Sequence, residues 1–249
     1  MASVHETAVR LLNEAARDIS HIAALPPGSE PRSVDEAHAL QKAVVAASGE
    51  AVAGWKVATD AQGQAMWGAI YAKDCLGSPA AVDAGRFPMR GVEGEVAFRF
   101  ERDLPARQAP YSRDELGAIL SAFPAIEIVD TRFASYEDTP VLHRLADRMS
   151  NGGIVLGTAS PGAASLDLAK LHVSLTRDGE TVIDQMGGHS KGDPLLPVLD
   201  FIHAVQAEQS FAAGQFITAG TFTGLVRGAA GESYVVSFEG LGDVSLSFI

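Results

Sequence analysis

Two segments near the N-terminus carry apolar residues at helical spacing. From residue 8 to residue 22 an apolar side chain recurs every three or four positions, which predicts an amphipathic helix that ends before Pro26. A second helix is predicted to begin at Ser33, because Ser33 and Glu36 have the spacing of a capping box, and to stop near Gly49. We therefore expect a helical N-terminal portion.

Beyond the second helix the pattern changes to short apolar runs separated by glycines, which is typical of strands. We expect strands over residues 52–57, 96–100, 126–129, 172–175, 181–184, 217–219, 235–238 and 244–249. A further helix is predicted from Ser112, which has Glu115 at capping-box spacing, to Leu120. Another is predicted from Pro194 to Val205. Strands that outnumber helices without alternating regularly favour an α+β sheet or roll over a doubly wound parallel sheet.

Length and composition fit one large folded unit. The chain has 249 residues, of which 47% are hydrophobic and 20% charged, as is ordinary for a globular protein. We find no fixed-period repeat, low-complexity segment or linker in the sequence. We therefore predict an N-terminal helical portion over residues 1–50 and a β-rich catalytic domain over residues 51–249, which together form one functional unit.

The charge of the chain disfavours several classes of partner. The formal net charge is −12 at pH 7 and the sequence has no cluster of Lys and Arg, which argues against nucleic acid and against an anionic membrane surface. The single cysteine, Cys75, excludes an internal disulfide and favours a cytoplasmic location. No run approaches roughly 18 consecutive apolar residues, so we predict no membrane-spanning segment.

The segment GVEGEVAF places two carboxylates inside an otherwise apolar strand. Because side chains alternate along a strand, Glu93 and Glu95 share one face, and Val96 and Phe98 share the other. Glu127, in PAIEIVD, lies between apolar neighbours in the same way. Three carboxylates that converge from apolar strands repel one another unless a cation balances them, and Mg²⁺ or Mn²⁺ suits such oxygen ligands. On spacing alone, the commoner explanation, solvated faces of half-exposed strands, stays open.

Lys56 lies in a short apolar strand, between Trp55 and Val57. An unpaired ammonium is costly in such surroundings, so an apolar pocket here favours an anion beside the lysine. The alternative from the sequence is a lysine that reaches solvent from the strand end.

Six segments match, in the same order, a family with known chemistry. They are GWKVA (54–58), GVEGEVAF (91–98), PAIEIVDTR (124–132), NGGIVLG (151–157), AGTFTG (219–224) and EGLGDVSLSF (239–248). The chain resembles the fumarylacetoacetate hydrolase superfamily, in the branch of the 2-keto-4-pentenoate hydratases and 4-oxalocrotonate decarboxylases. The resemblance covers nearly the whole chain and is more specific for the superfamily than for the substrate. It implies a mixed β-roll with an N-terminal helical part, usually as a homo-oligomer.

The resemblance also implies a set of site residues. It assigns Mg²⁺ or Mn²⁺ to Glu93, Glu95 and Glu127. It places Lys56, as a catalytic residue, near the carboxylate of a small 2-oxo acid substrate.

Three further positions are implied as substrate-binding residues. Asn151 and Thr221 fall in segments that line the family's pocket, and Arg132 occupies a position close to it. For Arg132 the sequence leaves an alternative open, which is a structural ion pair with Asp130 or Glu127.

The implied reaction is metal-dependent hydration of a 2-hydroxy-dienoate or 2-oxo-enoate to a 4-hydroxy-2-oxo acid, by a lyase of aromatic compound catabolism. Chelation through the carboxylate and the C2 oxygen would make C4 electrophilic, so that water adds there. Decarboxylation of an oxalocrotonate-like diacid and C–C hydrolysis of an acylpyruvate are the enzymatic alternatives. The alternative from another class is a metal-binding partner subunit of such an enzyme.

The chain departs from the family pattern at Met66, in AMWGAI, where the resemblance implies an acidic residue. A proton-transfer group from elsewhere is therefore expected. The candidates are His189, Asp193, His38 and Asp74. The first three also have a structural explanation, as an exposed loop histidine, a helix cap and a helix-face histidine.

Overall fold

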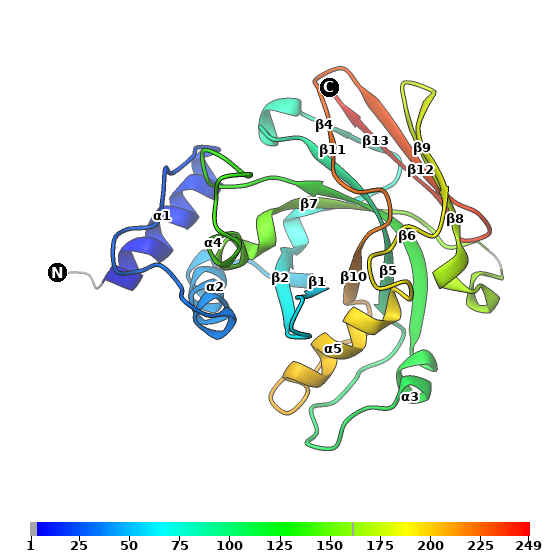
Figure 1. Ribbon diagram of the computed structural model, residues 1–249, viewed down its shortest axis with the longest axis horizontal. Helices are drawn as coiled ribbons and strands as arrows, with labels where there is room; N and C mark the ends of the chain where they lie inside the picture. The colour runs from blue at the N-terminus through cyan, green and yellow to red at the C-terminus, as the bar shows by residue number, and fades with distance from the viewer. Residues whose placement is uncertain (1–3, 161) are drawn as a thin grey trace.

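The structure is a computed structural model that describes residues 4–160 and 162–249, and it consists of two β-sheets with helices around them (Figure 1). The strands are β1 (Val52–Thr59), β2 (Ala65–Tyr71), β3 (Cys75–Gly77), β4 (Ala80–Val82), β5 (Gly91–Phe100), β6 (Leu120–Val129), β7 (Asn151–Leu156), β8 (His172–Arg177), β9 (Glu180–Met186), β10 (Phe216–Thr221), β11 (Val226–Arg227), β12 (Ser233–Phe238) and β13 (Gly242–Phe248). The α-helices are α1 (Val4–Asp18), α2 (Val34–Ser48), α3 (Arg113–Gly117), α4 (Val141–Ala146) and α5 (Leu195–Val205).

The larger sheet has eight strands in the order β2-β1-β10-β5-β6-β7-β3, with β11 paired to β5. The smaller sheet has five strands in the order β4-β13-β12-β8-β9. Parallel pairs such as β1 with β10 occur beside antiparallel pairs such as β5 with β6, so both kinds of ladder contribute. This arrangement confirms the predicted α+β class and the mixed β-roll. None of the helices in the described residues is long and apolar enough to cross a membrane.

Strand β5 separates two kinds of surroundings. Val92 and Val96 belong to the main apolar core, which also contains residues of the smaller sheet and of α5. Glu93 and Glu95 alternate with them and therefore point to the opposite face of the larger sheet. Strand β6 repeats this alternation around Glu127. The predicted separation of carboxylate and apolar faces is confirmed.

Gly94 lies where the two sheets approach each other most tightly around β5. A Cβ at this position would lie 2.7 Å from Cγ1 of Val236, in the smaller sheet, and 2.9 Å from Cγ2 of Thr223. Its backbone is also fixed, because its N–H donates to the Thr223 hydroxyl at 2.9 Å and its carbonyl accepts from Phe222 N at 2.8 Å. The backbone between Glu93 and Glu95 is therefore held from behind.

The N-terminal helices join the β-rich part through their own apolar cluster, which includes Leu12, Leu40 and Phe133. The cap of α2 is the predicted one, since the Ser33 side chain accepts a hydrogen bond from Glu36 N. The buried amide of Gln41 makes hydrogen bonds to backbone groups of β2 and of α4, at distances of 2.6 to 3.1 Å. These contacts fix α2 beside the sheet.

Two predicted helix ends are wrong, and β-pairing explains both. The first helix ends at Asp18 and not at Ile22, because Ile22 forms a β-bridge with Phe133. The helix at Ser112 ends at Gly117, and Leu120 already belongs to β6. In each case long-range pairing outweighs local helical spacing.

We expect Gly94→Ala to lower the free energy of unfolding by about 1–3 kcal/mol, because the added methyl group overpacks the junction of the two sheets. Urea unfolding followed by circular dichroism measures this loss. Gly77→Ala is the control, since a Cβ at Gly77 meets nothing within 4 Å and should change stability by less than about 0.5 kcal/mol. Equal stabilities of the two variants would contradict the close approach at Gly94.

Candidate metal centre and active-site cavity

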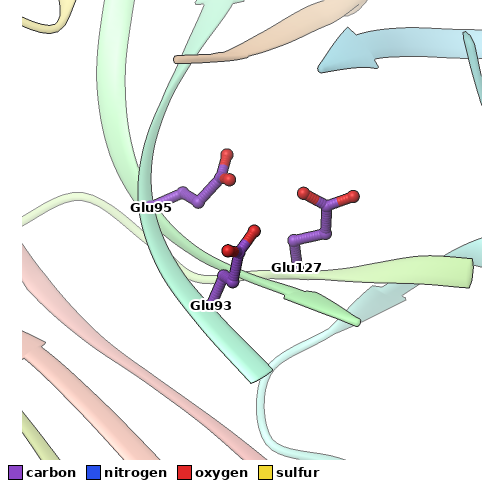
Figure 2. Close-up of side chains that lie close together, drawn as sticks. All are labelled: Glu93, Glu95 and Glu127. Carbon is purple, nitrogen blue, oxygen red and sulfur yellow. The ribbon is translucent and has the colours of Figure 1, made fainter. Parts of the chain in front are cut away.

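The three glutamates come together on neighbouring strands. Glu93 of β5 lies directly opposite Glu127 of β6 in the antiparallel ladder, and Glu95 is the next residue of β5 on the same face. Figure 2 shows the three carboxylates directed toward a common space. One carboxylate oxygen from each lies within 4.8 Å of the others. Strand alternation and cross-strand register together build this cluster.

Burial makes the cluster electrostatically unbalanced. Glu95 is 1% exposed and Glu127 is fully buried, while Glu93 is half-buried. Burial raises the pKa of Glu93 to about 7, with Lys56 opposing and Glu127 reinforcing the shift. Burial and the neighbouring Glu127 carboxylate raise the pKa of Glu95 well above its usual range. The protein alone does not fully compensate these charges.

Lys56 supplies one positive charge to the cluster. Lys56 lies on β1 of the same sheet, and its Nζ is 2.6 Å from Oε2 of Glu127. Burial alone would lower the pKa of Lys56, but Glu127, Glu93 and Glu95 raise it above the usual lysine value. The lysine is therefore protonated and paired, which answers the alternative that it reaches solvent from the strand end.

The residues present fit a hard divalent cation. When all three carboxylates are ionised, they and the one ammonium leave two negative charges in a buried space, which is the charge that a divalent ion would balance. All three donors are oxygen atoms, as Mg²⁺ and Mn²⁺ prefer. Glu93, Glu95 and Glu127 would hold the ion, and Lys56 would stay beside Glu127.

Hydrogen bonds behind the cluster orient its carboxylates. The Asn151 side chain donates to Oε1 of Glu127 at 2.9 Å, and Gly220 N donates to Oε2 of Glu95 at 3.3 Å. Gly220 has a φ of 101°, a conformation that favours glycine, at the irregular end of the β10 ladder. Such partners fix the direction of a ligand oxygen.

Arg132 lies behind the site, and its partner differs from those considered from the sequence. Its guanidinium forms a buried ion pair with Asp147, not with Asp130 or Glu127. It also donates to the carbonyl of Asn151 at 2.9 Å. Arg132 therefore holds the backbone of the residue that binds Glu127, and a contact of Arg132 with substrate stays a prediction. Nothing in the sequence pattern singled out Asp147.

Glu93 and Glu95 open onto a cavity of about 330 Å³. Its lining includes Lys56, Glu93, Glu95, Met149, His189 and Thr221. Of the predicted substrate-binding residues, Thr221 lines this cavity. Asn151 is fully buried, next to Glu127. The face of the sheet that carries Glu93 and Glu95 is thus accessible to a small molecule.

His189 is the proton-transfer candidate that reaches this cavity. It is buried, not exposed on its loop, and its Nε2 lies 2.8 Å from the carbonyl of Ala219. Its Nδ1 accepts a hydrogen bond from Lys191 N at 3.3 Å. Burial lowers its pKa, so the ring is neutral with both nitrogens engaged. In this conformation His189 shapes the cavity.

The other proton-transfer candidates have structural partners. His38 stacks on Trp67, and burial lowers the pKa of His38 to about 4. Asp193 accepts a hydrogen bond from Leu195 N at the start of α5 and pairs with Arg113. Asp74 pairs with Arg86 at 2.7 Å. Met66 lies on β2, which pairs with the lysine strand β1.

Comparison with known proteins places this geometry in a family. Residues 73–248 match the family described as fumarylacetoacetate (FAA) hydrolase C-terminal. The chain is 31% identical over 255 residues to 2-keto-4-pentenoate hydratase 2 of Dechloromonas aromatica (strain RCB), covering 98% of this chain and 97% of the relative. The chain belongs to the fumarylacetoacetate hydrolase family. Its relatives in the hydratase and decarboxylase branch are enzymes that carry the names expected from the sequence.

Two further comparisons extend this likeness. The chain is 28% identical over 169 residues to 4-oxalocrotonate decarboxylase of Pseudomonas putida, covering 68% of this chain and 63% of the relative. The fold is similar to that of 4-oxalocrotonate decarboxylase from Pseudomonas putida G7 complexed with magnesium and adipate, with a TM-score of 0.85 and 21% identity over 100% of this chain and 99% of that one. The second likeness concerns the fold.

We expect Glu95→Gln to weaken Mg²⁺ binding by more than about 100-fold without unfolding the protein, because loss of a charged ligand exceeds the usual effect of losing a supporting group. Isothermal titration calorimetry measures the affinity, and circular dichroism checks the fold. The control is Glu180→Gln, which makes the same substitution at an exposed glutamate of β9 and should leave Mg²⁺ affinity unchanged. Unchanged Mg²⁺ affinity in Glu95→Gln would remove Glu95 from the ligand set.

The raised pKa of Glu93 also predicts a pH dependence of stability in metal-free protein. A carboxyl whose pKa rises on folding stabilises the fold below its unfolded pKa of 4.5, and this stabilisation is lost as the pH rises to about 7. Relative to Glu93→Gln, the wild-type protein should therefore lose up to about 3 kcal/mol of stability across that window in EDTA. Saturating Mg²⁺ should remove the difference. Parallel stability curves in EDTA would refute the uncompensated charge.

Proposed function

We propose that this chain is a divalent-metal-dependent lyase that adds water to a small 2-hydroxy-dienoate or 2-oxo-enoate, giving a 4-hydroxy-2-oxo acid. The observation that carries the proposal is the buried cluster of Glu93, Glu95 and Glu127, paired with Lys56 and open to a small cavity. The 31% identity to a 2-keto-4-pentenoate hydratase along nearly the whole chain supports the reaction class.

Each group has a role that its surroundings make possible. When bound, a divalent ion supplies the electrophile that polarises the C2 oxygen of the substrate. Lys56 keeps its proton, because its carboxylate neighbours raise its pKa, and so offers a fixed positive charge to the substrate carboxylate. Thr221 offers a hydroxyl at the cavity wall. Mg²⁺ is the cation we favour, and Mn²⁺ has the same ligand preference.

Asn151 and Arg132 act through the metal ligand in this proposal. Asn151 holds Oε1 of Glu127 and Lys56 holds Oε2, so the two residues fix the direction of a carboxylate that would help to hold the ion. Arg132 fixes the backbone of Asn151 from behind. Both are positioning residues, which is why they lie beneath the cavity floor.

Decarboxylation is the second candidate, favoured by the 28% identity to a 4-oxalocrotonate decarboxylase over 68% of the chain. An oxalocrotonate-like diacid would use the same polarised C2 oxygen but lose CO₂ in place of gaining water. The far end of the substrate therefore decides between the two reactions. C–C hydrolysis of an acylpyruvate and a non-enzymatic partner subunit are further outcomes that the assay below separates.

We also propose that residues 1–50 and 51–249 work as one functional unit, since the buried Gln41 and the shared cluster around Phe133 join them. A cytoplasmic location is consistent with a single cysteine, Cys75, whose thiol pKa burial raises to about 12. A homo-oligomer remains our prediction from the family.

The direct test is an assay with 2-hydroxypenta-2,4-dienoate. We expect loss of its ultraviolet absorbance that requires Mg²⁺ or Mn²⁺ and releases no CO₂. Turnover of an oxalocrotonate-like diacid with CO₂ release would favour the decarboxylase, and cleavage of an acylpyruvate the hydrolase. Tight oxalate or pyruvate binding without turnover of any of these substrates would favour the partner subunit and refute the hydratase.

Lys56→Met should lower kcat/KM for the dienoate by at least about 100-fold, because the fixed positive charge beside the substrate is lost. Mg²⁺ affinity should be kept or increased, since a cation that competes for the same carboxylates is removed. Lys191→Met is the matched control, because Lys191 lines the same cavity from an exposed loop. Full activity of Lys56→Met would eliminate its catalytic role.

A further inference from the structure

A second cavity is lined by Arg148, whose neighbour Met149 lines the cavity at the three glutamates. It has a volume of about 460 Å³ and is bordered by the end of α1, by Tyr71 of β2 and by residues 86–88. Five cationic side chains line it: Arg17, Lys73, Arg86, Arg132 and Arg148. Three carboxylates line it: Glu50, Asp74 and Asp130. Asp18 and Asp147, which pair with Arg17 and Arg132, add two more carboxylates next to the cavity, so the pairing of each cation decides whether one of them is free to bind an anion.

Arg148 is the side chain that suggests an anion-binding site in this cavity. It is 5% exposed, and within the described ranges it has no carboxylate at ion-pair distance. Its Nη1 reaches the carbonyl of Ala69 at 3.4 Å, and its guanidinium lies 4.1 Å from the centre of the Tyr71 ring. Burial and the neighbouring Arg132 lower its pKa, and Tyr71, Asp147 and Asp74 oppose this shift only in part. Asp147 and Asp74 are already paired with Arg132 and Arg86. A buried guanidinium without an ion-pair partner of its own is costly, and an anion would reduce that cost.

The other cations of the cavity are already paired. Arg132 binds Asp147, Arg86 binds Asp74 at 2.7 Å, and Lys73 lies 3.3 Å from Glu50. Arg17, at the rim, binds Asp18 at 2.8 Å. Among these five cations, Arg148 is therefore the one without an ion pair to a carboxylate of the described residues.

Tyr71 provides an independent indication of a ligand. It lines the same cavity, and its hydroxyl is buried without a hydrogen-bond partner in the described residues. A hydroxyl donor beside a planar guanidinium is a suitable pair for the oxygens of a carboxylate or phosphate group. An unpartnered hydroxyl and a buried guanidinium that has no carboxylate at ion-pair distance point to the same chemistry.

We propose that this arginine cavity binds a small oxyanion, a carboxylate or a phosphate, with Arg148 and Tyr71 as its donors. The site is distinct from the metal-centre cavity but shares a wall with it. Arg148, Met149 and Ser150 have φ values of 51°, 53° and 58°, and Met149 lines the metal-centre cavity. Such consecutive left-handed residues are costly in isolation, so contacts on both sides must hold them. An oxyanion on Arg148 would supply one of those contacts.

The test is calorimetric titration of metal-free protein, prepared with EDTA and then dialysed free of it because EDTA is itself a polycarboxylate, with inorganic phosphate and with succinate in separate experiments. The uncompensated carboxylates of the metal-free centre repel both probes, so binding reports the arginine cavity. The stronger of the two probes identifies the oxyanion class. We expect Arg148→Asn to weaken that binding at least 10-fold, because asparagine accepts the left-handed backbone but removes the charge. Arg10→Gln, an exposed substitution on α1 outside this cavity, should leave the affinity unchanged.

Failure of both probes to bind, or equal affinity in wild type and Arg148→Asn, would overturn the proposal. A crystal structure of the wild-type protein with the stronger probe keeps the test decisive if the variant does not fold, since density away from Arg148 would also overturn it. A changed mass of Arg148→Asn in light scattering with unchanged anion affinity would assign the cavity to a subunit contact. Mg²⁺ titration and dienoate turnover are measured separately, so a failure here is distinguishable from a failure of the proposed lyase.

Discussion

Repulsion among three carboxylates on one face of a sheet is the constraint around which this molecule is organised. Glu93, Glu95 and Glu127 project from adjacent strands into a largely buried space, and a single ammonium, that of Lys56, opposes them. Burying like charges is tolerated only where hydrogen bonds, counter-charges or a bound cation offset it. The amide of Asn151, the ammonium and the raised carboxyl pKa values are all responses to that one problem.

The fold solves the positioning problem with a sheet whose two faces have different tasks. One face of β5 packs against the smaller sheet and supplies stability through residues such as Val92 and Val96. The other face carries Glu93 and Glu95. Because alternation along a strand is rigid, the packing of the apolar face sets the height and direction of the carboxylates. Stability and site geometry thus depend on the same ten residues of β5.

Part of this arrangement could be predicted from the sequence, because it depends on local periodicity. The alternation of polar and apolar residues around Glu93 and Glu127 predicted which face of the sheet each carboxylate lies on. The capping-box spacing at Ser33 predicted where α2 begins. The register that brings Glu127 opposite Glu93 could not be predicted by periodicity, because residues 101–119 intervene and no short hairpin fixes the pairing. The family resemblance supplied that step.

The features that could not be predicted from the sequence depend on contacts between residues far apart in the chain. The partner of Arg132 is Asp147, fifteen positions along the chain, and neither residue belongs to a recognisable motif. Gly94 also links the smaller sheet to the position of the carboxylates. Because its missing side chain leaves room for Val236, the volume of residue 236 in the smaller sheet limits how closely β5 can approach that sheet. A change of volume at this remote valine would therefore act on the position of Glu93 and Glu95 without altering any group of the carboxylate cluster.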